Sequence, residues 1–92
     1  MDFLVNVLIS VPDGVTAPEI DRLREAEAVR ASELAAVGHL VRLWRVPDDW
    51  ANWGLWRADD EEALRLLLDS LPLRRFMTLT IHPLTPHPND PG

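Results

Sequence analysis

Glu27 is the residue whose type and position most strongly suggest chemistry. It falls in a stripe of apolar residues at intervals of three and four in the first predicted helix; the other members are Ile20, Leu23, Ala31 and Leu34. A carboxylate on the buried side of a helix needs a partner, or it holds a proton at neutral pH. A desolvated glutamate is a good general base for removing a proton from carbon. The structural alternatives are a pair with an arginine and a position at the stripe edge, in contact with water.

Two arginines and one amide are candidate partners for an anion. Arg42 and Arg45 are three residues apart in a predicted strand, so they lie on opposite faces and at most one faces the helices. The other can point into the space between two sheets, where an arginine suits a carboxylate or a developing oxyanion, which it binds through paired hydrogen bonds. It also suits a structural ion pair with Glu27 or with a partner subunit. Asn52 is either an oxyanion donor or an ordinary residue at the edge of a turn.

All four tryptophans fall between residues 44 and 56, and two of them, Trp50 and Trp53, flank Asn52. This crowding indicates an aromatic-lined pocket or interface, although any single tryptophan also fits an ordinary core. We therefore select Trp50 and Trp53 as substrate-binding candidates. The three histidines are far apart and lack the spacing of metal ligands, so we expect no metal site. Among them only His87 is a site candidate, and it requires the C-terminal tail to fold back.

The composition excludes several classes of chemistry. The chain has no cysteine, lysine or tyrosine, which removes thiol nucleophiles, Schiff-base catalysis, a phosphate-loop lysine and a phenolic acid. Nine arginines face fifteen acidic residues, and the net charge of −6 argues against a nucleic-acid partner. No run approaches the roughly 18 apolar residues of a membrane span, and the N-terminus does not resemble a signal peptide. We expect a cytoplasmic protein with no membrane partner and no cofactor.

Turn and cap signals divide the chain into six elements and a tail. Thr16 and Glu19 form a predicted capping box, Gly38 ends the first helix, and Pro72 ends the second, which begins in an acidic run. The predicted order is a strand over 3–11, a helix over 17–37, strands over 39–46 and 50–57, a helix over 59–71 and a strand over 76–84. Residues 1–84 form one domain, and residues 85–92 are a proline-rich tail.

The order β-α-β-β-α-β predicts a ferredoxin-like α+β fold, in which a four-stranded antiparallel sheet carries both helices on one face. Both faces of the central hairpin carry large side chains. Strict alternation groups Leu40 with Arg42 and Trp44 on one face, and Val41 with Leu43 and Arg45 on the other. A small domain with an uncovered apolar sheet face usually covers it with a second copy, so we expect at least a homodimer.

Three segments together resemble the muconolactone isomerase family: Leu40–Arg45, Ala51–Trp56, and Ser70–Leu73 followed by Phe76-Met77. The resemblance continues to His87-Pro88 and covers nearly the whole chain. It implies a dimeric α/β barrel, with decamers in some members. It also implies a cofactor-free isomerase of the β-ketoadipate route of aromatic catabolism, or a related chloromuconolactone dehalogenase.

The implied reaction converts muconolactone to 3-oxoadipate enol-lactone by moving a proton along the unsaturated ring. It requires a base, an oxyanion donor and a clamp for the carboxymethyl group. The resemblance aligns Glu27 with the family's helix glutamate, which implies the base. It makes Asn52 the donor and Arg45 or Arg42 the clamp.

Three departures from the family pattern concern the substrate more than the fold. Trp50 replaces a tyrosine, Asp49 replaces a basic or neutral residue, and Arg74-Arg75 replaces an apolar residue and a proline. The two arginines either restore positive potential near the site or are simply solvated. Two other function classes remain open: a non-catalytic dimeric barrel that binds a small ligand, and a cofactor-independent oxygenase of the same architecture.

Overall fold

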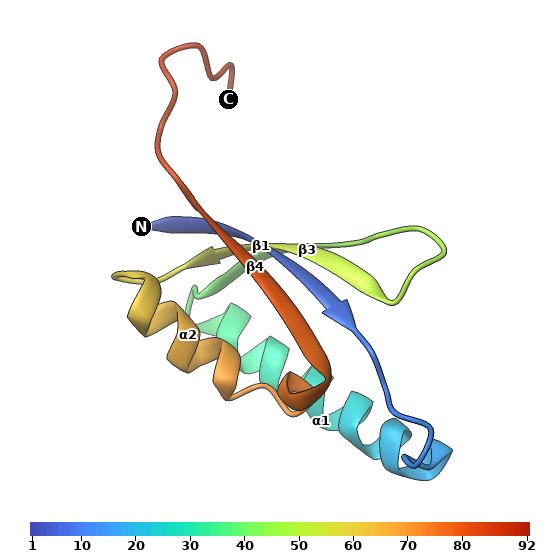
Figure 1. The fold of residues 1–92 in the computed structure, drawn as a ribbon. Coiled ribbons are helices and arrows are strands. Elements are labelled where there is room, and N and C mark those ends of the chain that lie inside the picture. Colours follow the sequence, from blue (N-terminus) through green and yellow to red (C-terminus); the bar gives the residue numbers. More distant parts are fainter.

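The computed structural model describes residues 1–92 and has the predicted order of elements. The elements are β1 (Asp2–Ile9), α1 (Ala17–Ala36), β2 (Leu40–Arg45), β3 (Ala51–Arg57), α2 (Glu61–Asp69), a short 3₁₀ turn (Arg74–Phe76) and β4 (Met77–Leu84). The strands pair antiparallel in the order β2-β3-β1-β4, and both helices lie on one face of the sheet (Figure 1). This arrangement confirms the ferredoxin-like α+β prediction.

Each strand differs from its predicted range by one or two residues at one end or both, and α2 covers 61–69 instead of 59–71. β1 ends at Ile9 instead of Val11, and beyond Ile9 its pairing with the neighbouring segment is reduced to one hydrogen bond, from the Ser10 N–H to the carbonyl of Phe76. Phe76 itself belongs to the 3₁₀ turn, and β4 begins one residue later.

Local signals start both helices and end α1 as predicted, whereas α2 ends at Asp69, before Pro72. The Thr16 hydroxyl accepts a hydrogen bond from the Glu19 N–H at 3.4 Å, and the Asp60 carboxylate caps α2 by accepting from the Ala63 N–H at 2.8 Å. After α1, Gly38 adopts a φ of 88°, a left-handed conformation that glycine reaches without steric cost.

The hydrophobic core lies under α2 and the C-terminal half of α1. Alternate residues of β1 point toward the helices and meet leucines from both of them. Its best buried members are at most 2% exposed: Phe3, Val5, Leu34, Leu64 and Leu68. This packing anchors one end of the sheet to the two helices.

Strand register decides which side chains of the central hairpin face the helices. Arg45 pairs with Asn52, whose other neighbour, Val7, is buried on the helix side, so Arg45 and Asn52 share that side. Arg42 and Trp44 alternate onto the opposite face. Arg42 and Arg45 thus lie on opposite faces, as predicted.

The predicted face of Leu40 was wrong. The register between β2 and β3 shifts between Leu40 and Arg42, and the irregularity at Val41 breaks the strict alternation. Leu40 therefore pairs with the buried Trp56 and packs against the core, on the same side as Leu43 and Arg45.

The opposite face of the sheet is covered by nothing in this chain. Four of its large apolar side chains are 36–49% exposed, and they are Leu8, Trp44, Trp53 and Leu84. None of the helices is long and apolar enough to cross a membrane.

Candidate functional site

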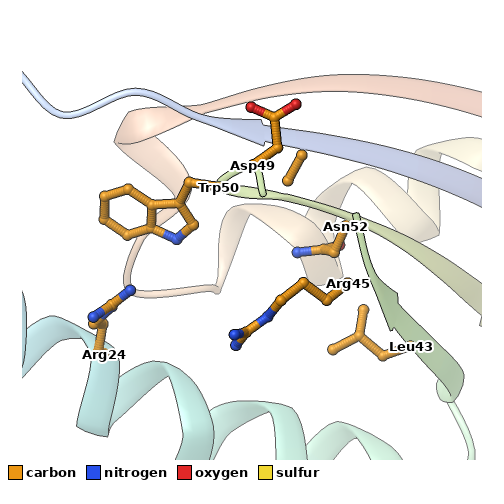
Figure 2. Close-up of a pocket in the computed structure, with 7 residues that line it drawn as sticks. Arg24, Leu43, Arg45, Asp49, Trp50 and Asn52 are labelled. Carbon is orange, nitrogen blue, oxygen red and sulfur yellow. The ribbon is translucent and has the colours of Figure 1, made fainter. Parts of the chain in front are cut away.

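A hollow of about 520 Å³ lies between the middle of α1 and the hairpin end of the sheet. α1 contributes Arg24 and Glu27, whereas the hairpin contributes Arg45, Trp50 and Asn52. The remaining lining is apolar: Ile9, Ala28, Ala31, Leu43, Leu73 and Met77. Figure 2 shows the outer part of this hollow, with Arg45 and Arg24 extending into the space between sheet and helix.

Glu27 is half-buried at the inner side of the hollow and has no arginine partner. Its Oε1 atom accepts a hydrogen bond from the backbone N–H of Leu73 at 2.9 Å, and none of the ion pairs of the chain includes it. Burial raises the pKa of the Glu27 carboxyl above its ordinary value, and the Leu73 hydrogen bond partly opposes that shift. The structural alternative of an arginine pair within the chain is therefore wrong.

The innermost part of the site is a small apolar cavity of about 40 Å³. Its only polar lining residues are Glu27 and Asn52, and the others include Val7, Leu40 and Trp56. A carboxylate beside an apolar cavity is weakly solvated, which strengthens it as a base toward a bound carbon acid.

Asn52 and Arg45 face Glu27 from the sheet. As cross-strand partners they project side by side into the hollow. The backbone carbonyl of Asn52 accepts from Asn6 Nδ2 at 3.3 Å, which fixes β3 against β1 at this point. The Arg45 guanidinium belongs to no ion pair of the chain, so its donors remain available to an anion.

Arg24 is the site residue that the sequence interpretation missed. It precedes Glu27 by three positions on α1, which places both on one helix face. Its guanidinium carbon lies 4.9 Å from the ring centroid of Trp50, close enough for a cation–π contact. The spacing from Glu27 was the available signal, but the partner ring lies 26 residues away in the sequence.

Three predicted site residues do not reach the hollow of their own chain. Arg42 and Trp53 lie on the uncovered face of the sheet, where Arg42 contacts the Trp44 ring at 5.1 Å and Trp53 lies 6.1 Å from His82, between ring centroids. His87 belongs to the tail, which leaves the body at the end of the sheet where the N-terminus lies (Figure 1).

The departures from the family pattern have defined positions. Asp49 borders the outer hollow, but its carboxylate points away from the two guanidinium groups (Figure 2). Arg74 pairs with Asp69 at 3.0 Å and Arg75 lies 4.0 Å from Glu19, so neither lends a free charge to the site. No three histidine or acidic side chains gather closely enough to hold a metal ion.

Fold and site together define a class: a ferredoxin-like domain with a carboxylate-containing hollow between its sheet and its first helix. Within that class the chain belongs to the muconolactone delta-isomerase family, whose model matches residues 1–90. This membership makes it an isomerase and confirms the resemblance drawn from the strand and helix-exit motifs.

Individual relatives agree along the whole chain. The muconolactone delta-isomerase of Pseudomonas aeruginosa is 32% identical over 97% of this chain and 93% of its own length. That of Cupriavidus pinatubonensis is 29% identical over 97% of both chains. A crystal structure of muconolactone isomerase superposes with a TM-score of 0.91, at 27% identity, over all of this chain and 96% of that one.

Proposed function

We propose that this chain isomerises muconolactone, or a closely related unsaturated lactone, by moving one proton and one double bond. The observation that carries the proposal is the half-buried Glu27 carboxylate, held by the Leu73 N–H in a hollow that also contains Asn52 and Arg45. Family membership supports the same reaction class. The predicted cytoplasmic location is part of the proposal.

Glu27 is the base in this mechanism. It takes the proton from the ring carbon beside the ring oxygen, and the electron pair moves through the double bond onto the lactone carbonyl oxygen. Protonation of the α-carbon then restores the carbonyl and leaves the double bond in its new position. The raised pKa of Glu27 suits this role, because it brings the basicity of the carboxylate closer to that needed to attack a weak carbon acid.

Asn52 and Arg45 stabilise the negative charge that appears during the reaction. Both line the hollow from neighbouring positions on the sheet, and Asn52 also reaches the inner cavity that Glu27 lines. An amide donor and a guanidinium fixed in advance favour an enolate oxygen over the neutral carbonyl of the ground state. Trp50 supplies an aromatic wall at the outer end of the hollow.

Conversion of muconolactone in deuterated water, followed by NMR, tests this function. We expect conversion to the enol-lactone with deuterium at the α-carbon of the product, because the transferred proton exchanges with solvent or enters from it. Turnover of another lactone but not muconolactone would keep the chemistry and change the substrate. Binding of lactones without any turnover would contradict the proposal and favour the ligand-binding alternative.

We also propose that two copies pair through the uncovered sheet face to form the dimeric barrel, with a homodecamer as the larger assembly. The exposed side chains of Leu8, Trp44 and Trp53 on that face support a self-complementary apolar contact. Sedimentation at micromolar concentration should find no monomer. Trp44→Glu should dissociate the assembly, since it would leave a charge buried between two sheets.

A further inference from the structure

The arginines of this chain separate into two groups. Five form ion pairs with carboxylates, and they are Arg30, Arg57, Arg65, Arg74 and Arg75. The four others have no carboxylate within 4.0 Å, and two of these, Arg24 and Arg45, line the same hollow. Two unpaired guanidinium groups in one hollow, in a chain of net charge −6, indicate recognition of an anion.

The two guanidinium groups differ in what surrounds them. Arg45 stands beside Asn52, which extends to the inner cavity where Glu27 lies. Arg45 also lines the outer part of the hollow, of about 410 Å³, together with Arg24 and Trp50, whereas Glu27 does not line it (Figure 2). Only Arg24 is stacked on the Trp50 ring there. The site therefore has a base at an apolar inner end and a cation stacked on an aromatic ring at its outer end.

Stacking prepares Arg24 to bind a planar anion. The Trp50 ring holds the guanidinium at 4.9 Å by one face and leaves its edge, which carries the N–H donors, free for hydrogen bonds. A guanidinium held in this way loses little side-chain freedom when a carboxylate binds, and two parallel hydrogen bonds fix the carboxylate plane. Asp49 does not occupy those donors, because it points away.

We propose that Arg24, stacked on Trp50, binds the carboxylate of the substrate and makes the site selective for anionic lactones over neutral ones. Arg45 then remains beside Asn52 for the enolate oxygen. The substrate lies with its ring toward Glu27 and its carboxymethyl group toward the outer end. The assignment to turnover rests on the proposed isomerase function, whereas the carboxylate site itself is independent of it.

Binding of an unreactive ligand tests the site without turnover. The probe is the saturated γ-lactone that carries an acetic acid group, and its methyl ester is the neutral control ligand. Tryptophan fluorescence measures the binding of each. Charge-assisted hydrogen bonds contribute about 1.5–3 kcal/mol, so Arg24→Gln should weaken binding of the acid by roughly 10- to 150-fold. Binding of the ester should change by less than about twofold.

Arg22→Gln is the matched control. Arg22 is also an arginine on α1 and also lacks an ion pair, but it does not line the hollow. It should leave binding of both ligands unchanged, and Arg24→Lys should restore part of the affinity for the acid. An Arg24→Gln effect below about fivefold on the acid, an equal effect on the ester, or an equal effect of Arg22→Gln would overturn the proposal.

Turnover assays separate this proposal from the function. With muconolactone, Arg24→Gln should raise KM by a similar factor and change kcat little, since the carboxylate contact exists before and during proton transfer. A protein that binds the acid probe through Arg24 but never converts muconolactone would refute the isomerase function alone. A protein that converts muconolactone equally well with and without Arg24 would refute the carboxylate assignment alone.

Discussion

The space between the sheet and the helices has two unlike ends. Under α2 it is filled, and Phe3, Val5, Leu64 and Leu68 are at most 1% exposed. Under the middle of α1 it contains the hollow with Glu27, and two unpaired arginines line it. The ends differ because α2 has nine residues and α1 has 20, so only α1 extends over the hairpin end of the sheet (Figure 1).

This difference separates stability from chemistry within one small domain. The filled end removes most of the apolar surface from water, which is the main source of folding free energy. The open end keeps a half-buried carboxylate and two exposed, unpaired guanidinium groups around a hollow, an arrangement that adds little to stability and suits a binding or catalytic site. Each prediction below changes one end and measures both properties.

The largest effect should come from Glu27→Gln at the open end. The amide keeps the shape of the side chain and an oxygen that accepts from the Leu73 N–H, but it is not a base. A general base contributes about 10²–10⁴ in rate, so kcat for muconolactone should fall by that factor while the melting temperature is retained.

Glu25→Gln is the matched control, because Glu25 is exposed on the same helix and does not line the hollow. It should leave turnover unchanged. Unimpaired turnover in a folded Glu27→Gln protein would remove Glu27 from the mechanism.

Leu68→Ala should do the reverse at the filled end. It empties part of a fully buried site, and such truncations lower the free energy of unfolding by about 2–5 kcal/mol. Denaturant unfolding measures the loss, and the activity per folded molecule should match that of the unaltered protein. A loss of kcat in the folded fraction comparable to that of Glu27→Gln would show that the two ends are not separable.

The pH dependence of turnover should follow the open end. Because burial raises the pKa of Glu27, the acid limb of kcat/KM should have its midpoint above the ordinary range of a glutamate. The folded state holds this proton more tightly than the unfolded state. The contribution of Glu27 to stability is therefore fully present below the unfolded pKa and is lost as pH rises through the folded pKa.

Across that pH window, the free energy of unfolding should therefore depend less steeply on pH in Glu27→Gln than in the unaltered protein. Leu68→Ala should keep the original pH dependence. An acid limb at the ordinary glutamate value would contradict the assignment of the limb to a desolvated Glu27.

The smallest effect should come from Asp60→Ala, which removes the N-terminal cap of α2, the helix that covers the filled end. Loss of such a cap costs about 0.5–2 kcal/mol, so the free energy of unfolding should fall slightly. Turnover should not change, since Asp60 does not line the hollow. A change in KM would indicate that α2 also controls the open end.

The sequence by itself determined the order of elements, the helix caps at Thr16 and Gly38, and the position of Glu27 in a buried stripe. These features depend on neighbours within a few residues, so local propensity, periodicity and cap chemistry are sufficient. The family motifs in β2, β3 and the segment after α2 could also be recognised in the sequence, because each is a contiguous run of residues. The selection of Glu27, Arg45, Trp50 and Asn52 from these signals found residues that the fold brings into one hollow.

Only the tertiary structure decided which arginines line this hollow. Whether Arg42 or Arg45 faces the helices depends on strand register, and the shift near Val41 moved Leu40 to the other face against simple alternation. The stacking of Arg24 on Trp50 and the Leu73 hydrogen bond to Glu27 join residues 26 and 46 positions apart. No local pattern encodes such pairs, because they form only when packing of the core brings α1 over the hairpin end of the sheet.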